Sequence, residues 1–529
     1  AAAGARRSLD DALQIAMRGG AVSGVFVSSV SLLGLAALFT AVLAYKGAFS
    51  GEPAAALQIA PSAPLMIVGY ALGGGFAALL AQLGGGAFAK AADVGADLAA
   101  LDAGLGDDAT RNPGVEADLA GDALGDGAAR ATALFASSTA ENIGAMLAGA
   151  ALFKANAGVP SALAVMLFPL VARGFGVVAT TFGVVVVRTD DREDPLAALG
   201  RGLYVAATLQ AVGMAGAAKW LLGPHWVAFF AAGLVGVVAA AALFPITAYF
   251  VEARHRPVRA IADASRAGVT LSLLEGLATG GDGAVVVLAL GAAATIAASV
   301  IGARTGLSGG ALYALAVASM GFLGTSGYML ALDAFGPALD GASGVVEATV
   351  AIDRPDVRGR AAVLDAVGNT AKALSRAHAT AAALITSLLL VSAYLDEVRR
   401  RALARGLIGA GALHARLDSP EVLIAALAGA LLVVWVAARV ISTVGRAARR
   451  VLEEARRQLR RGEGPAAGPR ARRPSGDLPD APRGARDGAP DPAACVEIAS
   501  RAALRSILAP ALASVAVPVV VGMALRFAR

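Results

Sequence analysis

Long apolar runs separated by short polar segments recur from one end of the chain to the other. Each run is about 20 residues long or more, which is the length an α-helix needs to cross the hydrocarbon core of a membrane. The pattern therefore predicts an all-α, polytopic membrane helix bundle with about eleven transmembrane helices. They are expected at 22–46, 63–83, 132–153, 160–187, 200–222, 226–250, 283–302, 308–332, 377–395, 421–440 and 506–526.

Composition agrees with a membrane protein. Of the 529 residues, 57% are hydrophobic and only 16% are charged, whereas soluble domains carry about 25% charged residues. The mean hydropathy is +0.67. The 64 glycines, together with many alanines, favour close packing of helices in lipid, where small residues let backbones approach one another.

The polar segments suggest three parts. Residues 1–461 are interpreted as one transmembrane helix bundle. Residues 462–490 are rich in Pro, Gly, Ala and Arg and can bury little, which predicts a disordered linker. Residues 491–529 are expected to form a further transmembrane helix.

The net charge of +6 comes mostly from arginine, including a block over 439–461. Basic segments of membrane proteins lie on the cytoplasmic side, so this block predicts orientation and contact with anionic lipid head groups. Aromatic residues are absent among these arginines, which argues against binding of nucleic acid. The single cysteine, Cys495, excludes an internal disulfide, and the four histidines share no metal-ligand spacing.

Two groups of acids carry the candidate chemistry. Lys90, Asp93 and Asp97 follow an apolar run, and a row of three aspartates follows some twenty residues later, at Asp118, Asp122 and Asp126. Residues four apart lie on one face of a helix, and acids in or beside membrane spans mark ion or substrate sites. Five carboxylates at this spacing beside one lysine predict a cage for a divalent metal and a polyanion.

The motifs resemble those of the membrane-bound, ion-translocating inorganic pyrophosphatases. The segment from Lys90 to Leu98, KAADVGADL, resembles the signature of that family, and the glycine triplet Gly84–Gly86 precedes it as in the family. Further segments resemble family segments in family order. These are Asp107-Asp108, Arg111-Asn-Pro113, the row Asp118/Asp122/Asp126, Arg256-Pro-Val-Arg259, Asp333-Ala-Phe-Gly-Pro337, the segment Leu364–Thr370, the segment Val444–Ala448 and the segment Pro490–Glu497.

The resemblance implies a fold of sixteen helices in two rings, assembled as a homodimer, of which this chain covers a part. It implies Mg²⁺-dependent hydrolysis of pyrophosphate that drives H⁺, or alternatively Na⁺, across a membrane. The site would lie around 82–126 and 333–376 and face the cytoplasm, and the membrane would be the inner membrane of a bacterium. The linker 462–490 would then also be cytoplasmic.

The resemblance also implies roles for individual residues. Lys90 would contact phosphate, Asp126 would position and deprotonate the attacking water, and Arg376 would stand in place of a catalytic lysine. Asp340 and Asn369 would bind substrate and metal from the other side of the site. The metal ligands implied are Asp93, Asp97, Asp118, Asp122, Asp126, Asp340 and Asn369.

Lys372 bears on the need for potassium. It stands three residues after Asn369, where the potassium-independent branch of the family carries a lysine. Its ammonium would replace a bound K⁺, so the resemblance implies potassium-independent pumping. The alternative is an ordinary basic residue near a helix end.

The sequence also departs from the family at functional positions. Gln82 replaces an arginine, Leu101 a lysine, and Ala133 and Ala136 two acids of the ion gate. The family's last two helices, with a further Asp/Lys cluster, have no counterpart, and we expect the sequence to be shortened at both ends. A catalytically weak or inactive relative with only a binding or structural role therefore stays as an alternative. An ordinary secondary transporter would predict internal symmetry and broken helices near mid-membrane, which the sequence does not favour.

Overall fold

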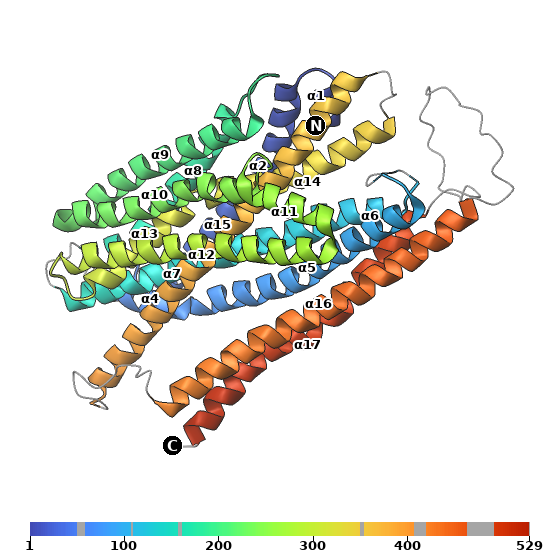
Figure 1. Cartoon of the computed structure of the whole chain (residues 1–529). Helices are drawn as coiled ribbons and strands as arrows, with labels where there is room; N and C mark the ends of the chain where they lie inside the picture. The colour runs from blue at the N-terminus through green and yellow to red at the C-terminus, as the bar shows by residue number, and fades with distance from the viewer. Residues whose placement is uncertain are drawn as a thin grey trace. The chain divides into compact units, whose positions relative to one another are not determined.

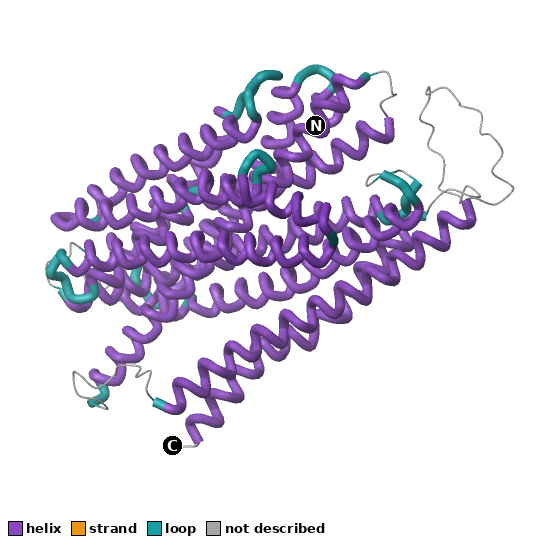
Figure 2. The backbone as a smooth tube through the Cα atoms, in the orientation of Figure 1, coloured by secondary structure: helices purple, strands orange, loops and turns teal. Residues whose placement is uncertain are grey.

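The computed structural model describes residues 1–49, 59–106, 109, 111–156, 161–349, 354–406, 419–462 and 491–527. All regular structure in these ranges is helical, as Figure 2 shows. The helices are, in chain order, α1 (Ala2–Ala5), α2 (Leu9–Tyr45), η1 (Ala60–Ser62), α4 (Ala63–Met66), α5 (Val68–Ala103), α6 (Val115–Ala120), η2 (Gly121–Asp126), α7 (Gly127–Ala155), α8 (Ala162–Val186), α9 (Pro195–Leu221), η3 (Gly223–His225), α10 (Trp226–Val251), α11 (Arg256–Ala267), α12 (Val269–Ala303), α13 (Gly310–Leu323), α14 (Ser326–Thr349), α15 (Pro355–Ala404), α16 (Pro420–Gly462) and α17 (Pro492–Phe527).

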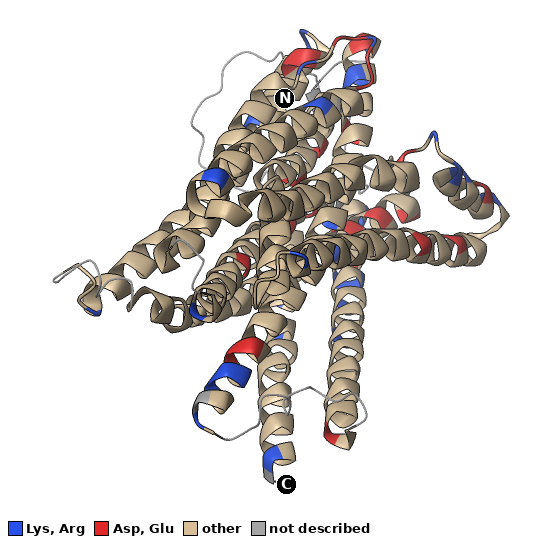
Figure 3. Cartoon of the chain, turned by 90° about the vertical axis from the view of Figure 1, so that its left-hand side faces the viewer, with Lys and Arg blue, Asp and Glu red and all other residues tan. Residues whose placement is uncertain are grey.

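The predicted all-α membrane bundle is confirmed. Nine of the eleven predicted spans each fall on one helix, whereas 63–83 covers α4 and the start of α5, and 308–332 covers α13 and the start of α14 (Figure 1). Within the described ranges, nine helical segments are long and apolar enough to cross a membrane. The spans expected at 132–153 and 200–222 lie on α7 and α9, which are not among those nine. Most of the length of the long helices carries no charged residue, and the charged residues gather in short groups, as Figure 3 shows.

Local sequence explains where several helices begin. Ser8 accepts a hydrogen bond from the backbone N–H of Asp11 and caps α2, and Ser161 does the same for α8 through Ala164 N. Asp194 caps α9, with Pro195 in the first turn. These side chains satisfy N–H groups that have no partner inside the helix, so the boundaries follow from residues next to each apolar run.

The described residues form two compact units. The first comprises Ala1–Ala78, Arg130–Ser343 and Arg354–His414, and the second comprises Leu79–Ala129, Gly344–Asp353 and Ala415–Arg529. Of the linker predicted at 462–490, all but Gly462 lies outside the described residues. The motif Asp107-Asp108 lies wholly outside them.

The core of the first unit is built by small residues as much as by large ones. A Cβ on Gly236 of α10 would overlap the carbonyl oxygen of Ala318 of α13, and one on Gly321 of α13 would overlap that of Gly233. The two backbones therefore meet directly, as small residues permit in lipid. The apolar window of the α13–α14 segment is entirely buried, and Tyr313 in it is fully buried and donates a hydrogen bond to Val165 O at 3.0 Å.

Candidate functional site

In the second unit, α5 packs directly against the helical segment formed by α6 and η2. A Cβ on Gly85 would overlap the carbonyl oxygen of Gly125, and one on Gly121 would lie 2.8 Å from the Cα of Ala89. Real Cβ atoms do not approach other atoms so closely, so both glycines are required for this contact. Small residues let the two backbones meet, and they bring the two acidic groups side by side.

A third contact and one asparagine set the register of the two helical segments. A Cβ on Gly114 would lie 2.9 Å from the Cα of Ala96. The Asn112 side chain donates to Ala96 O at 2.9 Å and accepts from Gly114 N at 3.0 Å. The three contacts run antiparallel with a constant offset. This offset places Asp93 level with Ala117, next to Asp118 in the chain.

The opposite faces of these helices rest on α16 and α17. Ala92 of α5 and Ala117 of α6 are buried in a cluster with Val451, Cys495 and Ala499. Near the end of α5, Asp102 accepts two hydrogen bonds from the Arg456 guanidinium of α16, at 2.7 and 2.9 Å. The alanine faces are thus occupied by packing, which leaves the aspartates on the other sides of the helices.

The first acidic group is partly solvated. Lys90 Nζ lies 2.5 Å from Asp93 Oδ2, one turn away on α5. The Lys90 side chain is 51% exposed and that of Asp93 is 27% exposed, and Asp97 is also exposed. Carboxylates in this setting keep their hydration and stay accessible to a cation from solution.

The second row differs from the continuous α-helix that its spacing predicted. Asp118 lies on α6, whereas Asp122 and Asp126 lie on the π-helical turn Gly121–Asp126. Asp118 and Asp122 are partly exposed, and Asp126 is buried at 9% exposure. The row therefore runs from an α-helical segment into a π-helical one. Glycines at 121 and 125 hold this wider turn against α5. Such turns are rare and are frequent at functional sites.

The donor set suits a hard divalent cation. Carboxylate oxygens are the ligands that Mg²⁺ prefers, and four of the five aspartates of the two groups are at least partly exposed. Across the described ranges, no three His, Cys, Asp or Glu side chains are arranged to hold a metal ion. The described aspartate side chains do not surround a common point, so the metal ligands named from the sequence stay a prediction.

The remaining predicted residues belong to the first unit. Lys372 of α15 lies with its Nζ 3.4 Å from Asp340 Oδ2 of α14, and both side chains are largely buried, at 10% and 22% exposure. The helices meet at Gly336 and Gly368. Asn369 is exposed and Arg376 is half-buried, both on α15. The structure brings Asp340 and Lys372 together, and the role of each residue stays a prediction.

The positions that depart from the family pattern lie on α5 and α7. Gln82 and Leu101 are exposed on α5, and Leu101 reaches 75% exposure. Ala133 and Ala136 lie on α7 and are half-buried. An uncharged residue therefore stands at each of these positions. Around them, the described residues show no packing defect.

One buried ion pair was missed as a pair by reasoning from sequence. Glu141 of α7 is fully buried, and its Oε2 accepts a hydrogen bond from Arg173 Nη2 of α8, whose side chain is 4% exposed. Arg173 Nη1 donates to Leu323 O at 2.5 Å and to Ser326 Oγ at 3.2 Å. The carbonyl of Leu323 ends α13, so Arg173 satisfies a group that the helix leaves unpaired.

The signal for this pair was present in the sequence. Both residues are charges within runs that are otherwise apolar, and such residues are functional candidates by default. The surroundings hold further polar atoms without a hydrogen-bond partner among the described residues, including Glu141 Oε1, Asn142 Oδ1 and both ring nitrogens of His378. Buried polar atoms of this kind are usually satisfied by ordered water. The His378 ring stacks on Phe322 at 4.6 Å.

Comparison with known proteins agrees with this picture. The family model described as "Inorganic H+ pyrophosphatase" matches residues 1–529. The chain is 39% identical, over 99% of its length and 71% of the relative, to a protein of Moorella thermoacetica named "K(+)-insensitive pyrophosphate-energized proton pump 2". It is 37% identical, over 99% of its length and 70% of the relative, to a protein of Caldanaerobacter subterraneus subsp. tengcongensis named "K(+)-insensitive pyrophosphate-energized proton pump".

A plant protein is also similar. The chain is 35% identical, over 99% of its length and 64% of the relative, to a protein of Arabidopsis thaliana named "Pyrophosphate-energized membrane proton pump 3". The family model covers every motif from which the resemblance was inferred, and the apolar helices fit an integral membrane protein. The chain therefore belongs to the inorganic H⁺ pyrophosphatase family, whose function is pyrophosphate hydrolysis coupled to proton translocation.

Proposed function

We propose that this chain binds pyrophosphate as its magnesium complex at the two acidic groups of the second unit, hydrolyses it, and couples hydrolysis to proton transport. The observation that carries the proposal is the direct packing of α5 on α6 and η2, which places Lys90, Asp93 and Asp97 beside the row that begins at Asp118. Family membership supports the reaction, and the local geometry supports the location.

The proposed roles follow from charge and burial. Asp93, Asp97, Asp118 and Asp122 are partly exposed carboxylates and would hold Mg²⁺ through their oxygens. When bound, the metal would neutralise charge that develops on the phosphate oxygens. Asp126 is the most buried aspartate of the two groups. Its carboxylate would orient the attacking water and accept its proton.

Lys90 would bind phosphate, and this requires its ion pair with Asp93 to open. The pair is more than half exposed on the lysine side, so the cost of breaking it is small. When Asp93 turns to a cation, the ammonium of Lys90 is released toward the anion. From the family resemblance alone, Asp340, Asn369 and Arg376 of the first unit are proposed to bind substrate, with Asp340 and Asn369 also as metal ligands.

We further infer that hydrolysis does not need potassium. Lys372 places a compact ammonium 3.4 Å from Asp340 Oδ2 in a largely buried setting. A bound K⁺ would neutralise the same carboxylate, so a lysine removes the need for the ion. Two of the similar proteins are named as K⁺-insensitive, which supports this proposal.

Coupling needs a group that can carry a proton within the membrane. Glu141 is proposed for this role, because it lies buried in α7 and keeps one oxygen without a hydrogen-bond partner among the described residues. The Arg173 guanidinium fixes the other oxygen. Buried polar atoms nearby, including those of Asn142 and His378, would hold the waters through which the proton reaches it. Sodium is the alternative ion.

The setting of the protein in the cell is proposed as well. The basic end of α16 would lie in the cytoplasm, since basic segments stay on that side. The acidic groups would then face the cytoplasm, in the inner membrane of a bacterium. The chain would assemble as a homodimer, as the resemblance implies.

The first experiment is Mg²⁺-dependent phosphate release from pyrophosphate by reconstituted vesicles, with and without K⁺, together with proton uptake. The Asp126→Asn variant is expected to lose release by at least about 100-fold, whereas Asp102→Asn, which alters an exposed carboxylate on the same helix pair, should retain it. Equal release by wild type and Asp126→Asn would overturn the proposed site.

Coupling is tested in the same vesicles. Glu141→Gln should retain phosphate release and lose proton uptake, because the amide cannot exchange a proton. Uptake that persists in this variant would exclude Glu141 as the carrier. The alternative of an inactive relative gains no support from the comparisons, and it predicts no release by the wild type itself.

A further inference from the structure

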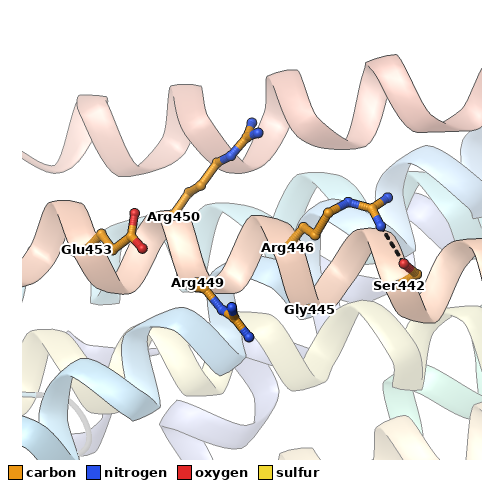
Figure 4. A pocket seen from close by; sticks show the side chains of 6 residues that line it. All are labelled: Ser442, Gly445, Arg446, Arg449, Arg450 and Glu453. Carbon is orange, nitrogen blue, oxygen red and sulfur yellow. Dashed lines mark hydrogen bonds between the residues drawn. The ribbon is translucent and has the colours of Figure 1, made fainter.

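A cavity rich in arginine lies on the helix pair α16 and α17. One part, of about 440 Å³, is lined, among the described residues, by Ser442, Gly445, Arg446, Arg449, Arg450 and Glu453 of α16. An adjoining part of about 280 Å³ is lined by Arg446 and Arg450 from α16 and by Arg505 from α17. Figure 4 shows Arg446 and Arg450 pointing toward one side of α16 and Arg449 pointing toward the other.

Within the described ranges, the four arginines that line this cavity form no ion pair with an acid. Other arginines of the same two helices are paired: Arg456 with Asp102, Arg457 with Glu454 and Arg501 with Glu497. In the part of the chain that the structure describes, no such pair involves the arginines at 446, 449, 450 and 505. Among the described lining residues Glu453 is the one acid, so this part of the lining has an excess of positive charge.

The geometry is fixed by neutral groups. The Arg446 guanidinium donates to Ser442 Oγ and, at 3.3 Å, to Thr443 Oγ1. The helices run antiparallel, and Gln458 holds them in register through two hydrogen bonds with the backbone of Asp491, at 2.9 and 2.6 Å. The Arg446 guanidinium is thus positioned by neutral groups, and a guanidinium in this setting can bind a phosphate through paired N–H donors.

The cavity lies where both helices change from apolar to charged sequence. On α16 the residues 421–440 are apolar apart from Glu421 and Arg439, and they span about 30 Å at 1.5 Å per residue, which matches the thickness of the hydrocarbon core. The Arg439 guanidinium lies 5.8 Å from the Trp435 ring, and tryptophan is enriched at the membrane–water interface. On α17, Arg505 stands just before the apolar residues 506–526. The arginines therefore lie at the level of lipid head groups.

Exposed apolar side chains continue from the cavity along both helices. Those of α16 include Leu427, Leu431 and Val434, and those of α17 include Leu508 and Leu512, all more than half exposed. An acyl chain would cover the exposed apolar side chains, and a phosphate would bind the arginines. A phospholipid carries both groups in one molecule. Free phosphate would satisfy only the second.

We propose that the cavity formed by Arg446, Arg450 and Arg505 binds the phosphate group of an anionic phospholipid. The site is separate from the acidic groups on α5, α6 and η2, because α5 contacts α16 through Ala448 and Val451 on another face of that helix. The proposal does not depend on hydrolysis of pyrophosphate, and its test does not measure activity.

The test is native mass spectrometry of the full chain, purified in a neutral detergent and titrated with phosphatidylglycerol or with phosphatidylcholine of the same acyl chains. Wild type should bind phosphatidylglycerol preferentially. Arg446→Gln/Arg450→Gln should weaken this binding by about tenfold or more, as expected for two basic residues at a membrane surface. Phosphatidylcholine binding should not change.

A matched control replaces two other exposed arginines, Arg256→Gln/Arg259→Gln on α11, and should bind phosphatidylglycerol as wild type does. Arg446→Lys/Arg450→Lys keeps the charge and should bind with intermediate affinity, because lysine cannot form the paired contact. Equal loss in the α11 control, or no loss in Arg446→Gln/Arg450→Gln, would overturn the proposal. Displacement of the lipid by millimolar inorganic phosphate would assign the cavity to free phosphate instead.

Discussion

The two acidic groups, one on α5 and one on α6 and η2, differ sharply from the buried ion pair of Glu141 and Arg173. In the group on α5, Lys90 and Asp93 are 51% and 27% exposed. In the first unit, Arg173 and Glu141 are 4% and 0% exposed. One region keeps its carboxylates hydrated on helices that meet through glycine and alanine. The other removes a carboxylate from water and fixes it with a guanidinium.

The difference teaches how one chain can serve two chemical needs. A divalent cation and a polyanion must enter from solution, so their ligands cannot be locked into buried pairs. A charge inside the membrane must instead be compensated at all times, because an isolated buried ion costs several kcal/mol. Lys372 and Asp340, at 10% and 22% exposure, lie between these limits, and Arg456 and Asp102, at 41% and 45%, lie at the exposed end.

The largest effect is expected from breaking the buried pair. Arg173→Met leaves Glu141 without its partner and removes the donor to Leu323 O, and it should destabilise the protein by about 3–5 kcal/mol. The measurement is denaturant unfolding in detergent. Glu141→Gln/Arg173→Met should recover part of the loss, since no unpaired charge remains. A double variant less stable than Arg173→Met would show that the pair is not the source of the effect.

The next effect tests the packing that aligns the two acidic groups. Gly85→Ala places a Cβ against Gly125 O and should force α5 away from η2. Because small displacements of reacting groups are costly, phosphate release should fall by about tenfold to a hundredfold. Gly86→Ala is the matched control, as its Cβ would have no atom within 4 Å. Equal activity of the two variants would separate the glycine contact from catalysis.

A smaller effect concerns the partly buried pair. Lys372→Ala removes the ammonium beside Asp340, and a monovalent cation can then compensate the carboxylate. Phosphate release should fall and be restored by K⁺ by roughly tenfold, the equivalent of about 1.4 kcal/mol. Lys219→Ala, at an exposed lysine of α9, should show no response to K⁺. A Lys372→Ala enzyme that ignores K⁺ would refute the proposed role of this lysine.

The smallest effect is expected at the exposed pair. Arg456→Gln removes both hydrogen bonds to Asp102, yet solvent screens such pairs and their net contribution is small. The midpoint of thermal unfolding should move by less than about 1 °C. A large shift would mean that the exposure of an ion pair does not predict its contribution to stability. The comparison between the two regions would then lose its basis.

The sequence by itself determined the helical membrane fold. Apolar runs of about 20 residues admit little else in lipid, because every backbone N–H and C=O must be satisfied within its own segment. All eleven predicted spans lie on helices. The ordered motifs, from Lys90 to Glu497, also identified the family that the comparisons show.

Only the tertiary structure decided which charged groups meet. The spacing of Asp118, Asp122 and Asp126 predicted one helical face, but it did not predict the π-turn at Gly121–Asp126, where Gly121 and Gly125 contact α5. Glu141 and Arg173 are 32 residues apart, and Asp102 and Arg456 are 354 apart. No local sequence pattern encodes such pairs, because they form between residues that only the packing of the helices brings together.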